Sequence, residues 1–255
     1  MNTKVYIFTD KFHSHVDIET SETMRLLSLP EVRFYNSDFN GVILSGIDWL
    51  SSKSQMLGKI LKKFLGVSDE SEPITSRTRI LRGFFQNPDY VMRNKELILK
   101  KLFNAINSVE QTSMKVKELK LKYPHYQVVH LRFGDFKNSE FGVVSPQSFK
   151  SIIDPRIPTL ICTDGSREEV LENANFPYEE ILTPSKLNPW ETLCIIQGAS
   201  RFIGVNSTLS WWGAFLVTSK GNSAFLPDKW KKSGDLKDYD LLRLDGGVKY
   251  EVEFI

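Results

Sequence analysis

Short β-rich runs alternate with helix-like segments over the second half of the chain, and this alternation constrains the fold more than any other feature. Strands that alternate with helices of this length are typical of a parallel sheet covered by helices. In such a sheet, ligands bind where the carboxyl ends of strands meet the starts of helices. We therefore predict an α/β fold with strands at residues 127–133, 159–162, 180–182, 201–205 and 223–226 and helices at 146–153, 167–173, 189–198 and 208–217.

The first half of the chain has a different pattern and is expected to be largely helical. Helices are predicted at 22–29 and from about 88 to 118, where apolar residues recur at helical spacing. Strands are predicted at 4–8 and 42–44. A lysine-rich run ends this half, so we expect one domain at 1–123 and a second at 124–255.

Composition excludes several classes of protein. The 33 Lys and Arg residues are balanced by 31 Asp and Glu residues, which argues against a protein that coats nucleic acid. Cys162 and Cys194 lie in apolar surroundings and are expected to be reduced, buried thiols of a cytoplasmic protein. The first residues lack the layout of a signal peptide, and no apolar run approaches the roughly 20 residues of a membrane-spanning helix.

Residues 53–65 leave two explanations open. Apolar residues recur there at helical spacing, and the lysines of the stretch face no acid within it: Lys53, Lys59, Lys62 and Lys63. Such a helix can rest on an anionic membrane surface. The commoner arrangement packs the apolar face inward, and we favour it. At most, we expect a peripheral contact with a membrane.

The strand at 127–133 ends in polar residues that need partners. The period of a strand places His130 and Arg132 on one face, and Gly134 allows a sharp turn that brings Asp135 to the same edge. A guanidinium at such an edge suits bidentate binding of phosphate. The alternative is a structural ion pair between Arg132 and Asp135 with His130 merely packed, and spacing alone gives the two about equal weight.

The strand at 201–205 runs directly into a helix start that is rich in hydroxyl groups. Asn206, Ser207 and Thr208 are good N-cap residues, and Ser210 follows within the first turn. Backbone N–H groups at a helix start, with hydroxyls beside them, make a site for an anion such as phosphate. An ordinary N-cap is the alternative explanation.

A third candidate is Asp164, which follows the strand at 159–162. An acid at this position can accept hydrogen bonds from a ribose or a base, although an Asp before a Gly also forms a plain turn. Asp238 and Asp240 form an Asp-x-Asp triplet of the kind that holds a metal in many glycosyltransferases. It lies outside the repeating strand pattern, so we discount it and expect no metal site.

Taken together, these motifs resemble the α-1,2-fucosyltransferase family, glycosyltransferase family 11. The family carries His-x-Arg-Arg-Gly-Asp-Tyr, and residues 130–136 are His-Leu-Arg-Phe-Gly-Asp-Phe. It also carries Asn-Ser-Ser-Phe-Ser-Trp-Trp-Gly-Ala-Trp-Leu, and residues 206–216 are Asn-Ser-Thr-Leu-Ser-Trp-Trp-Gly-Ala-Phe-Leu. This second match is long and specific. Smaller similarities lie at 83–87 and 163–165 and at Pro227 and Trp230.

The resemblance implies a GT-B-like architecture, with a Rossmann-like nucleotide-binding domain at 124–255. The domain at 1–123 would be a more helical acceptor-side domain, shortened because the family's Gly-Gly-Leu-Gly-Asn-Gln segment is missing. The implied reaction is inverting transfer of L-fucose from GDP-fucose to a galactose-type acceptor, with α-1,2 linkage, on a glycan or O-antigen precursor. A lipid-linked acceptor is compatible with this reaction, and no metal or other cofactor is expected.

The resemblance also implies roles for particular residues. Arg132 would stabilise the departing GDP, and a carboxylate would take the proton of the acceptor hydroxyl. Asp135 is the first candidate for that base and Glu140 the second. The donor would be contacted by His130, Arg132, Gly134, Asp164, Asn206, Ser207, Thr208 and Ser210.

Two alternatives to this enzyme remain. The family's N-terminal Gly-rich segment is missing and Phe133 stands where the family has a second Arg, so the chain could be an inactive homologue that binds a GDP-sugar without turnover. It could also be a transferase that uses a different nucleotide sugar. Discrimination between them requires binding and transfer assays.

Overall fold

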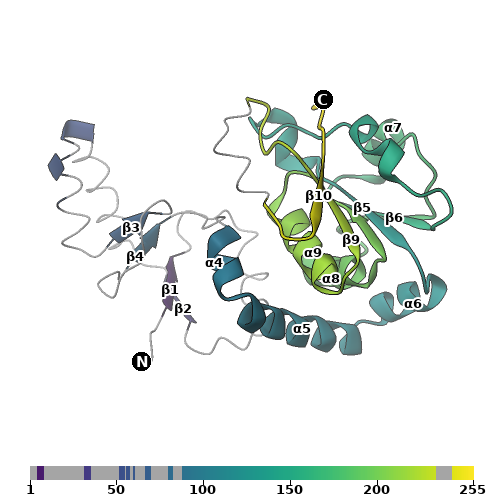
Figure 1. The fold of residues 1–255 in the computed structure, drawn as a ribbon, viewed down its shortest axis with the longest axis horizontal. Helices are drawn as coiled ribbons and strands as arrows, with labels where there is room; N and C mark the ends of the chain where they lie inside the picture. Colours follow the sequence, from purple (N-terminus) through teal and green to yellow (C-terminus); the bar gives the residue numbers. More distant parts are fainter. Residues whose placement is uncertain are drawn as a thin grey trace. The chain divides into compact units, whose positions relative to one another are not determined.

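A computed structural model describes residues 5–8, 32–35, 52–54, 56–57, 60, 67–69, 80–82, 88–233 and 243–255 (Figure 1). The chain divides into two compact units, Met1–Gln86 and Asn87–Ile255. In the first unit, β1 (Val5–Phe8) pairs in parallel with β2 (Val32–Tyr35), and β3 (Val67–Asp69) pairs with β4 (Ile80–Arg82). The strand predicted at 4–8 is confirmed. The helix predicted at 22–29 and the strand at 42–44 lie outside the described residues.

The second unit contains a parallel sheet of six strands in the order β10-β9-β8-β5-β6-β7. From the β7 edge, this is the strand order of Rossmann-type domains. The five strands predicted for this half are confirmed to within two residues at their ends, and β10 was not predicted. The strands are β5 (Gln127–Leu131), β6 (Thr159–Thr163), β7 (Glu180–Leu182), β8 (Arg201–Ile203), β9 (Ser223–Pro227) and β10 (Gly247–Tyr250).

The chain changes direction across the sheet between β5 and β8. It first adds β6 and β7 on one side of β5 and then returns to place β8 on the other side. The two strands pair in register, with Gln127 opposite Arg201 and Val129 opposite Ile203. Connections leave their carboxyl ends in opposite directions, which opens the crevice where Rossmann-type sheets bind ligands.

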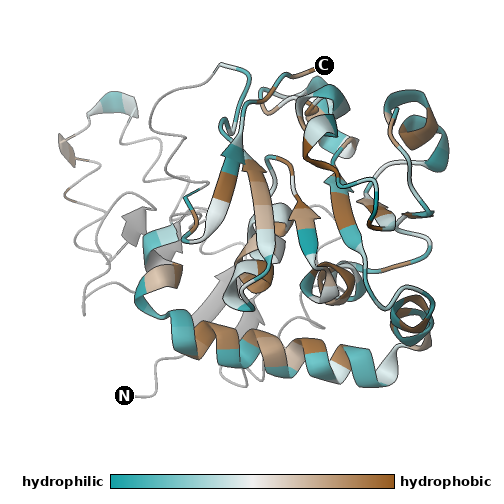
Figure 2. Ribbon diagram, turned by 45° about the vertical axis from the view of Figure 1, so that its right-hand side comes forward, coloured by the Kyte–Doolittle hydropathy of each residue, from teal (hydrophilic) through white to brown (hydrophobic). Residues whose placement is uncertain are grey.

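Apolar residues recur along the strands of the sheet (Figure 2), and many of them are buried. On one face, strand residues such as Val129 and Ile161 join one buried cluster with Val170 of α7 (Arg167–Asn173). The opposite face packs against α8 (Pro189–Gly198) and α9 (Thr208–Ser219), which lie against each other (Figure 1). The predicted helices 167–173, 189–198 and 208–217 are confirmed.

The connection from β5 to β6 differs from the prediction. A helix was expected at 146–153, but the chain forms two short 3₁₀ helices, Pro146–Ser148 and Lys150–Ile152. Phe149 interrupts them with a non-helical backbone, and its fully buried ring packs against Phe176 and Tyr250. Burial of this ring therefore takes precedence over continuous helical hydrogen bonding.

The long helix expected at about 88–118 is three helices, α4 (Pro88–Arg93), α5 (Lys95–Thr112) and α6 (Met114–Lys122). Ser113 separates the last two, because its hydroxyl accepts a hydrogen bond from Val116 N and caps α6. The buried side of α5 packs against α8, where the Cys194 thiol approaches Ile106 O at 3.5 Å. These helices therefore lie in the same compact unit as the sheet, and the boundary predicted between 123 and 124 falls inside that unit.

The two cysteines and the apolar residues of the stretch 53–65 differ in their burial. Cys162 and Cys194 are buried free thiols, as predicted, and burial raises the pKa of each to about 12. In the stretch 53–65, the described apolar side chains Met56, Leu57 and Ile60 are exposed, so inward packing is not observed for these three. In the part of the chain that the structure describes, no helix combines the length and the apolar character needed to cross a membrane.

Candidate functional site

The polar residues selected from the sequence lie at or after the carboxyl ends of three neighbouring strands, β8, β5 and β6. His130 is the fourth residue of β5, and Arg132 comes directly after this strand. Asp164 follows β6, and Asn206 lies three residues beyond the end of β8. The parallel pairing brings these positions to one edge of the sheet, at the switch in strand order.

The guanidinium of Arg132 lies between two carboxylates. Its Nη2 atom is 2.8 Å from Asp135 Oδ1, and its Nη1 atom is 3.0 Å from Asp164 Oδ2. The ion pair with Asp135 was one of the two sequence interpretations, whereas the contact with Asp164 was not predicted. One positive and two negative charges leave this group with a net charge of −1. The Nε atom of Arg132 is buried and has no hydrogen-bond partner among the described residues.

The two carboxylates are held to different degrees. Asp164 also accepts a hydrogen bond of 2.7 Å from Phe133 N, and 21% of its side chain is exposed. Asp135 makes one ion pair, at the surface, with 72% of its side chain exposed. An incoming anion can therefore replace Asp135 on the guanidinium more easily than Asp164.

Gly134 has a different role from the predicted one. It does not adopt a positive φ angle but begins a 3₁₀ helix, Gly134–Asn138. A Cβ atom at this position would collide with Asp164 Oδ2. The absence of a side chain therefore lets Asp164 approach the backbone closely, and a sharp turn is not what requires glycine here.

His130 is buried against the first turn of α9. It is 2% exposed, and its Nδ1 atom lies 2.7 Å from Ser210 Oγ. Burial, with a smaller contribution from the charge of Arg132, lowers the pKa of His130 from its usual 6.5 to about 3. The imidazole is therefore neutral at neutral pH.

The hydroxyl groups at the start of α9 differ in their exposure. Ser207 caps the helix by accepting a hydrogen bond of 3.1 Å from Ser210 N, as an ordinary N-cap does. Ser207 and Ser210 are both buried, and their hydroxyls bond to each other at 3.1 Å. Thr208, in the first turn, is exposed. Of these three hydroxyl residues, Thr208 is the one that presents its side chain at the surface.

Asn206 links two loops beside the site. Its fully buried amide donates to Phe141 O at 3.0 Å and to Trp230 O at 2.9 Å. Its Oδ1 atom is buried and accepts from none of the described residues. The structure therefore gives Asn206 a clamping role, with one acceptor left unused.

Glu140 lies in the loop that Asn206 holds. Its carboxylate forms an ion pair of 2.9 Å with Lys231 and is 61% exposed, and its backbone oxygen accepts from Lys232 N at 3.0 Å. Sequence reasoning did not select Lys231. Its position directly after Trp230, where the resemblance noted in the sequence ends, was the available signal.

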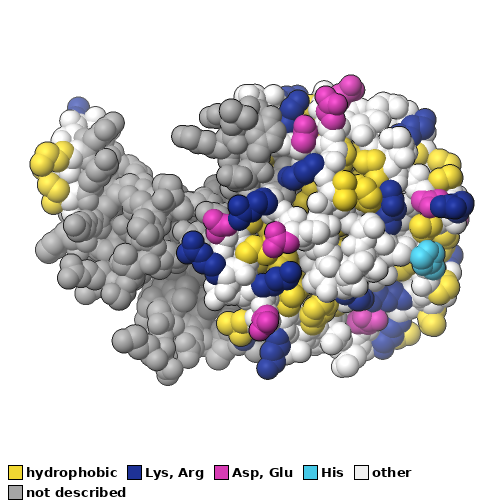
Figure 3. All heavy atoms as spheres, viewed as in Figure 1, with side chains coloured by type: hydrophobic (Ala, Val, Ile, Leu, Met, Phe, Trp, Pro, Cys, Tyr) yellow, Lys and Arg dark blue, Asp and Glu magenta, His cyan; other side chains and the backbone are white. Residues whose placement is uncertain are grey.

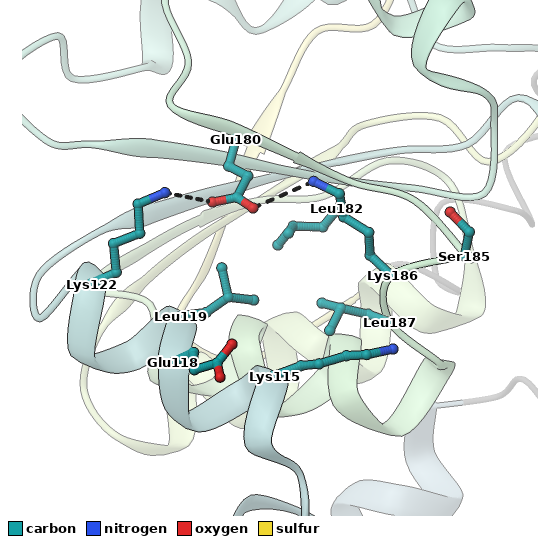
Figure 4. Close-up of a pocket in the computed structure, with 9 residues that line it drawn as sticks. All are labelled: Lys115, Glu118, Leu119, Lys122, Glu180, Leu182, Ser185, Lys186 and Leu187. Carbon is teal, nitrogen blue, oxygen red and sulfur yellow. Dashed lines mark hydrogen bonds and ion pairs between the residues drawn. The ribbon is translucent and has the colours of Figure 1, made fainter.

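The cavity lined by α6, β7 and the chain after β7 contains none of the residues selected from the sequence. It has a volume of about 380 Å³, with leucines inside it and Glu180 held between Lys122 and Lys186 (Figure 4). On the face drawn in Figure 3, acidic and basic side chains are interspersed over the described residues. The described residues also include no group of three metal-ligating side chains, and Asp238 and Asp240 lie outside them.

Comparison with known proteins adds no assignment. No protein-family model, no curated protein and no solved structure matches the chain. The geometry of the site and the motifs that occupy it therefore carry the functional argument.

Proposed function

We propose that this protein is an inverting fucosyltransferase with a GT-B-like architecture, which transfers L-fucose from GDP-fucose to a galactose-type acceptor in α-1,2 linkage. The observation that carries the proposal is Arg132, which stands at the switch in strand order with a buried donor, Nε, that has no partner in the described chain. A buried donor of this kind calls for an acceptor supplied from elsewhere. The resemblance of residues 130–136 and 206–216 to family 11 selects the type of nucleotide sugar.

In this proposal, the donor diphosphate binds between Arg132 and the start of α9. The guanidinium and the N-terminal end of the helix supply positive charge to the departing GDP. Asp135 leaves Arg132 as the diphosphate arrives, because it is the more exposed of the two carboxylates. Asp164 stays bound to Phe133 N and keeps the guanidinium oriented.

A carboxylate takes the proton of the acceptor hydroxyl as the new bond forms. Asp135 is the first candidate, since its displacement from Arg132 would free it when the donor is bound. Glu140 is the second candidate, on the loop held by Asn206 and paired with Lys231. Both side chains are exposed, so an acceptor can reach either of them.

The proposed acceptor is a glycan or O-antigen precursor, and a lipid-linked precursor would be met at the cytoplasmic face of the inner membrane. The proposal places the protein in the cytoplasm, with at most peripheral membrane contact. It includes no metal, no cofactor and no nucleic-acid partner.

One observation favours a second candidate, a GDP-sugar-binding protein without turnover. Phe133 occupies the position of the family's second Arg, and its ring is buried in the core cluster. The site therefore has one guanidinium fewer to offset the two phosphates of the donor. Turnover, and not binding alone, separates this candidate from the enzyme.

The test combines ligand binding with transfer. Thermal shifts with GDP, GDP-fucose, GDP-mannose and UDP-galactose, with and without a chelator, are followed by mass spectrometry of galactoside acceptors. We expect GDP and GDP-fucose to raise the melting temperature most and fucose to appear on the galactoside. Binding without transfer across the acceptor panel would favour the second candidate, and absence of any GDP binding would refute both.

Arg132→Ala and Arg156→Ala form a matched pair for this test. Arg156 also pairs with a carboxylate, that of Asp154, but it is highly exposed and precedes the amino end of β6, whereas Arg132 follows the carboxyl end of β5. We expect Arg132→Ala to abolish transfer and Arg156→Ala to retain it. Equal activity of the two variants would remove Arg132 from the mechanism.

A further inference from the structure

The hydroxyl of Ser210 stands at the centre of a small buried network. Its Oγ atom accepts a hydrogen bond of 3.0 Å from Val205 N and lies 3.1 Å from Ser207 Oγ. It also lies 2.7 Å from His130 Nδ1. All three contacts come from parts of the chain that the sheet brings together at the β5–β8 switch.

Counting hydrogens decides the direction of these bonds. A hydroxyl has one hydrogen to donate and two lone pairs that accept. The contact between the two hydroxyls has the geometry of a hydrogen bond donated by Ser207 Oγ to Ser210 Oγ, and Ser207 Oγ itself accepts from Ser210 N. With Val205 N as the second donor, both lone pairs of Ser210 Oγ are used. The hydrogen of Ser210 is therefore donated to Nδ1 of His130.

The imidazole must then carry its proton on the other nitrogen. Nδ1 acts as an acceptor, so the neutral ring is the tautomer with hydrogen on Nε2. No described residue accepts a hydrogen bond from Nε2, and this atom is not one of the fully buried atoms without a partner. An acceptor from outside the described chain can therefore bind there.

We propose that Ser210 is a positioning residue, which fixes His130 as the neutral Nε2–H tautomer and so presents a single hydrogen-bond donor to a bound nucleotide. The tautomer follows from the contacts within the protein, whereas the identity of the ligand rests on the proposed function. The matching ligand group is an acceptor without a formal charge, such as a carbonyl or ring nitrogen of the base or an oxygen of the ribose.

The neutral donor complements Arg132 at the same edge of the sheet. A guanidinium binds a phosphate through charge and paired N–H groups, whereas a neutral imidazole N–H favours a neutral acceptor over a donor group. His130 thereby contributes selectivity for the nucleoside part of the ligand, and Ser210 maintains that selectivity by preventing the Nδ1–H tautomer.

The tautomer is measured first, by ¹⁵N-edited NMR of the imidazole at neutral pH in the full chain. We expect protonated Nε2 and unprotonated Nδ1 in the wild type. A ring protonated on Nδ1, or a mixture of the two tautomers, would overturn the proposal. Ser210→Ala should give the mixture, and the matched variant Ser219→Ala should not. Ser219 lies on the same helix, but its hydroxyl bonds to Leu216 O.

The second part of the proposal, donation of a hydrogen bond from His130 to a bound nucleotide, is tested by titration with GDP. We expect Ser210→Ala to bind GDP about 5–10-fold more weakly, the effect of one misdirected hydrogen bond, and Ser219→Ala to bind as the wild type does. Equal affinity of the two variants would overturn the positioning role. If the wild type itself binds no GDP, the proposed function fails, while the NMR result for the tautomer stands.

A second pair of variants covers the case in which Ser210→Ala does not fold. His130→Gln keeps an N–H donor at the far end of the side chain, whereas His130→Ala removes it. We expect His130→Gln to bind GDP more tightly than His130→Ala. Equal loss in both variants would exclude donation by His130 to the ligand.

Discussion

The Nη1 atom of Arg132 lies 3.0 Å from Asp164 Oδ2, and this ion pair joins the ends of the neighbouring strands β5 and β6. Asp164 is itself fixed by Phe133 N, so the guanidinium is held from one side. On its other side, Arg132 contacts the exposed Asp135. The arrangement separates an anchoring carboxylate from an exchangeable one, and the variants below distinguish the two.

Asp135→Asn and Asp164→Asn should have opposite effects on GDP affinity. Loss of the exchangeable charge at Asp135 should tighten GDP binding by up to about 5-fold, because a surface ion pair contributes about 0.2–1 kcal/mol. Loss of charge at Asp164 should weaken binding and lower the melting temperature, because Arg132 loses its anchor. Isothermal titration calorimetry measures both affinities. Tighter binding by Asp164→Asn would reverse the assignment.

Gly134→Ala should destabilise the fold through one identified collision. The new Cβ would meet Asp164 Oδ2, and we expect a loss of about 1–3 kcal/mol in the free energy of unfolding. The double variant Gly134→Ala with Asp164→Ala removes the colliding oxygen. Chemical denaturation of the two single variants and the double variant should therefore show a favourable coupling energy, whereas purely additive losses would contradict the collision.

Asn206→Ala should cost more than the similar change at Asn222. Asn206 donates to two carbonyls, Phe141 O and Trp230 O, whereas Asn222 Nδ2 donates to Ala199 O alone. Because buried carbonyls lose their partner, we expect a loss of about 2–3 kcal/mol for Asn206→Ala and about 1 kcal/mol for Asn222→Ala. Urea unfolding measures both. Equal losses would show that the second hydrogen bond of Asn206 adds nothing to the free energy of unfolding.

The buried His130 should make stability depend on acidity below its unfolded pKa. Burial lowers the pKa in the folded state to about 3, so between pH 6.5 and 3 the unfolded chain binds a proton that the folded protein does not. Above pH 6.5, His130 is neutral in both states and does not lower the free energy of unfolding. Between pH 6.5 and 3, the free energy of unfolding falls by about 1.4 kcal/mol for each pH unit, because the unfolded chain binds the proton. Urea unfolding of wild type and His130→Gln from pH 7 to 4.5 should show a steeper loss for the wild type. Parallel curves would exclude a buried neutral imidazole.

Elements with local signals were predictable from the sequence. The helices α7 and α8 begin and end at the predicted residues, because Ser166 with Glu169 and Asn188 with Glu191 form capping boxes at their starts. The long helix expected before the sheet is divided at Ser113, because the hydroxyl of this residue accepts from Val116 N and begins a new helix within the apolar periodicity. Side-chain caps therefore determined where α6, α7 and α8 begin.

The residue types of the site were predictable, but their partners were not. The motifs located the strand end at Arg132 and the helix start at Ser207, yet the sequence did not show that Asp164 would reach the guanidinium. Nor could it show which hydroxyls of the helix start face the core and which face solvent. These partners come from other strands, and only the packed sheet determines them.

The contact between His130 and Ser210 spans 80 positions of the chain and depends on the pairing of β5 with β8. Between these strands the chain must first complete β6 and β7, so the contact belongs to the non-local pairings that form slowly in folding. During synthesis, β5 and Arg132 leave the ribosome well before α9 does. A nascent chain therefore cannot assemble this edge of the sheet until α9 has emerged, so it cannot hold a ligand there while only β5, β6 and β7 have been synthesised.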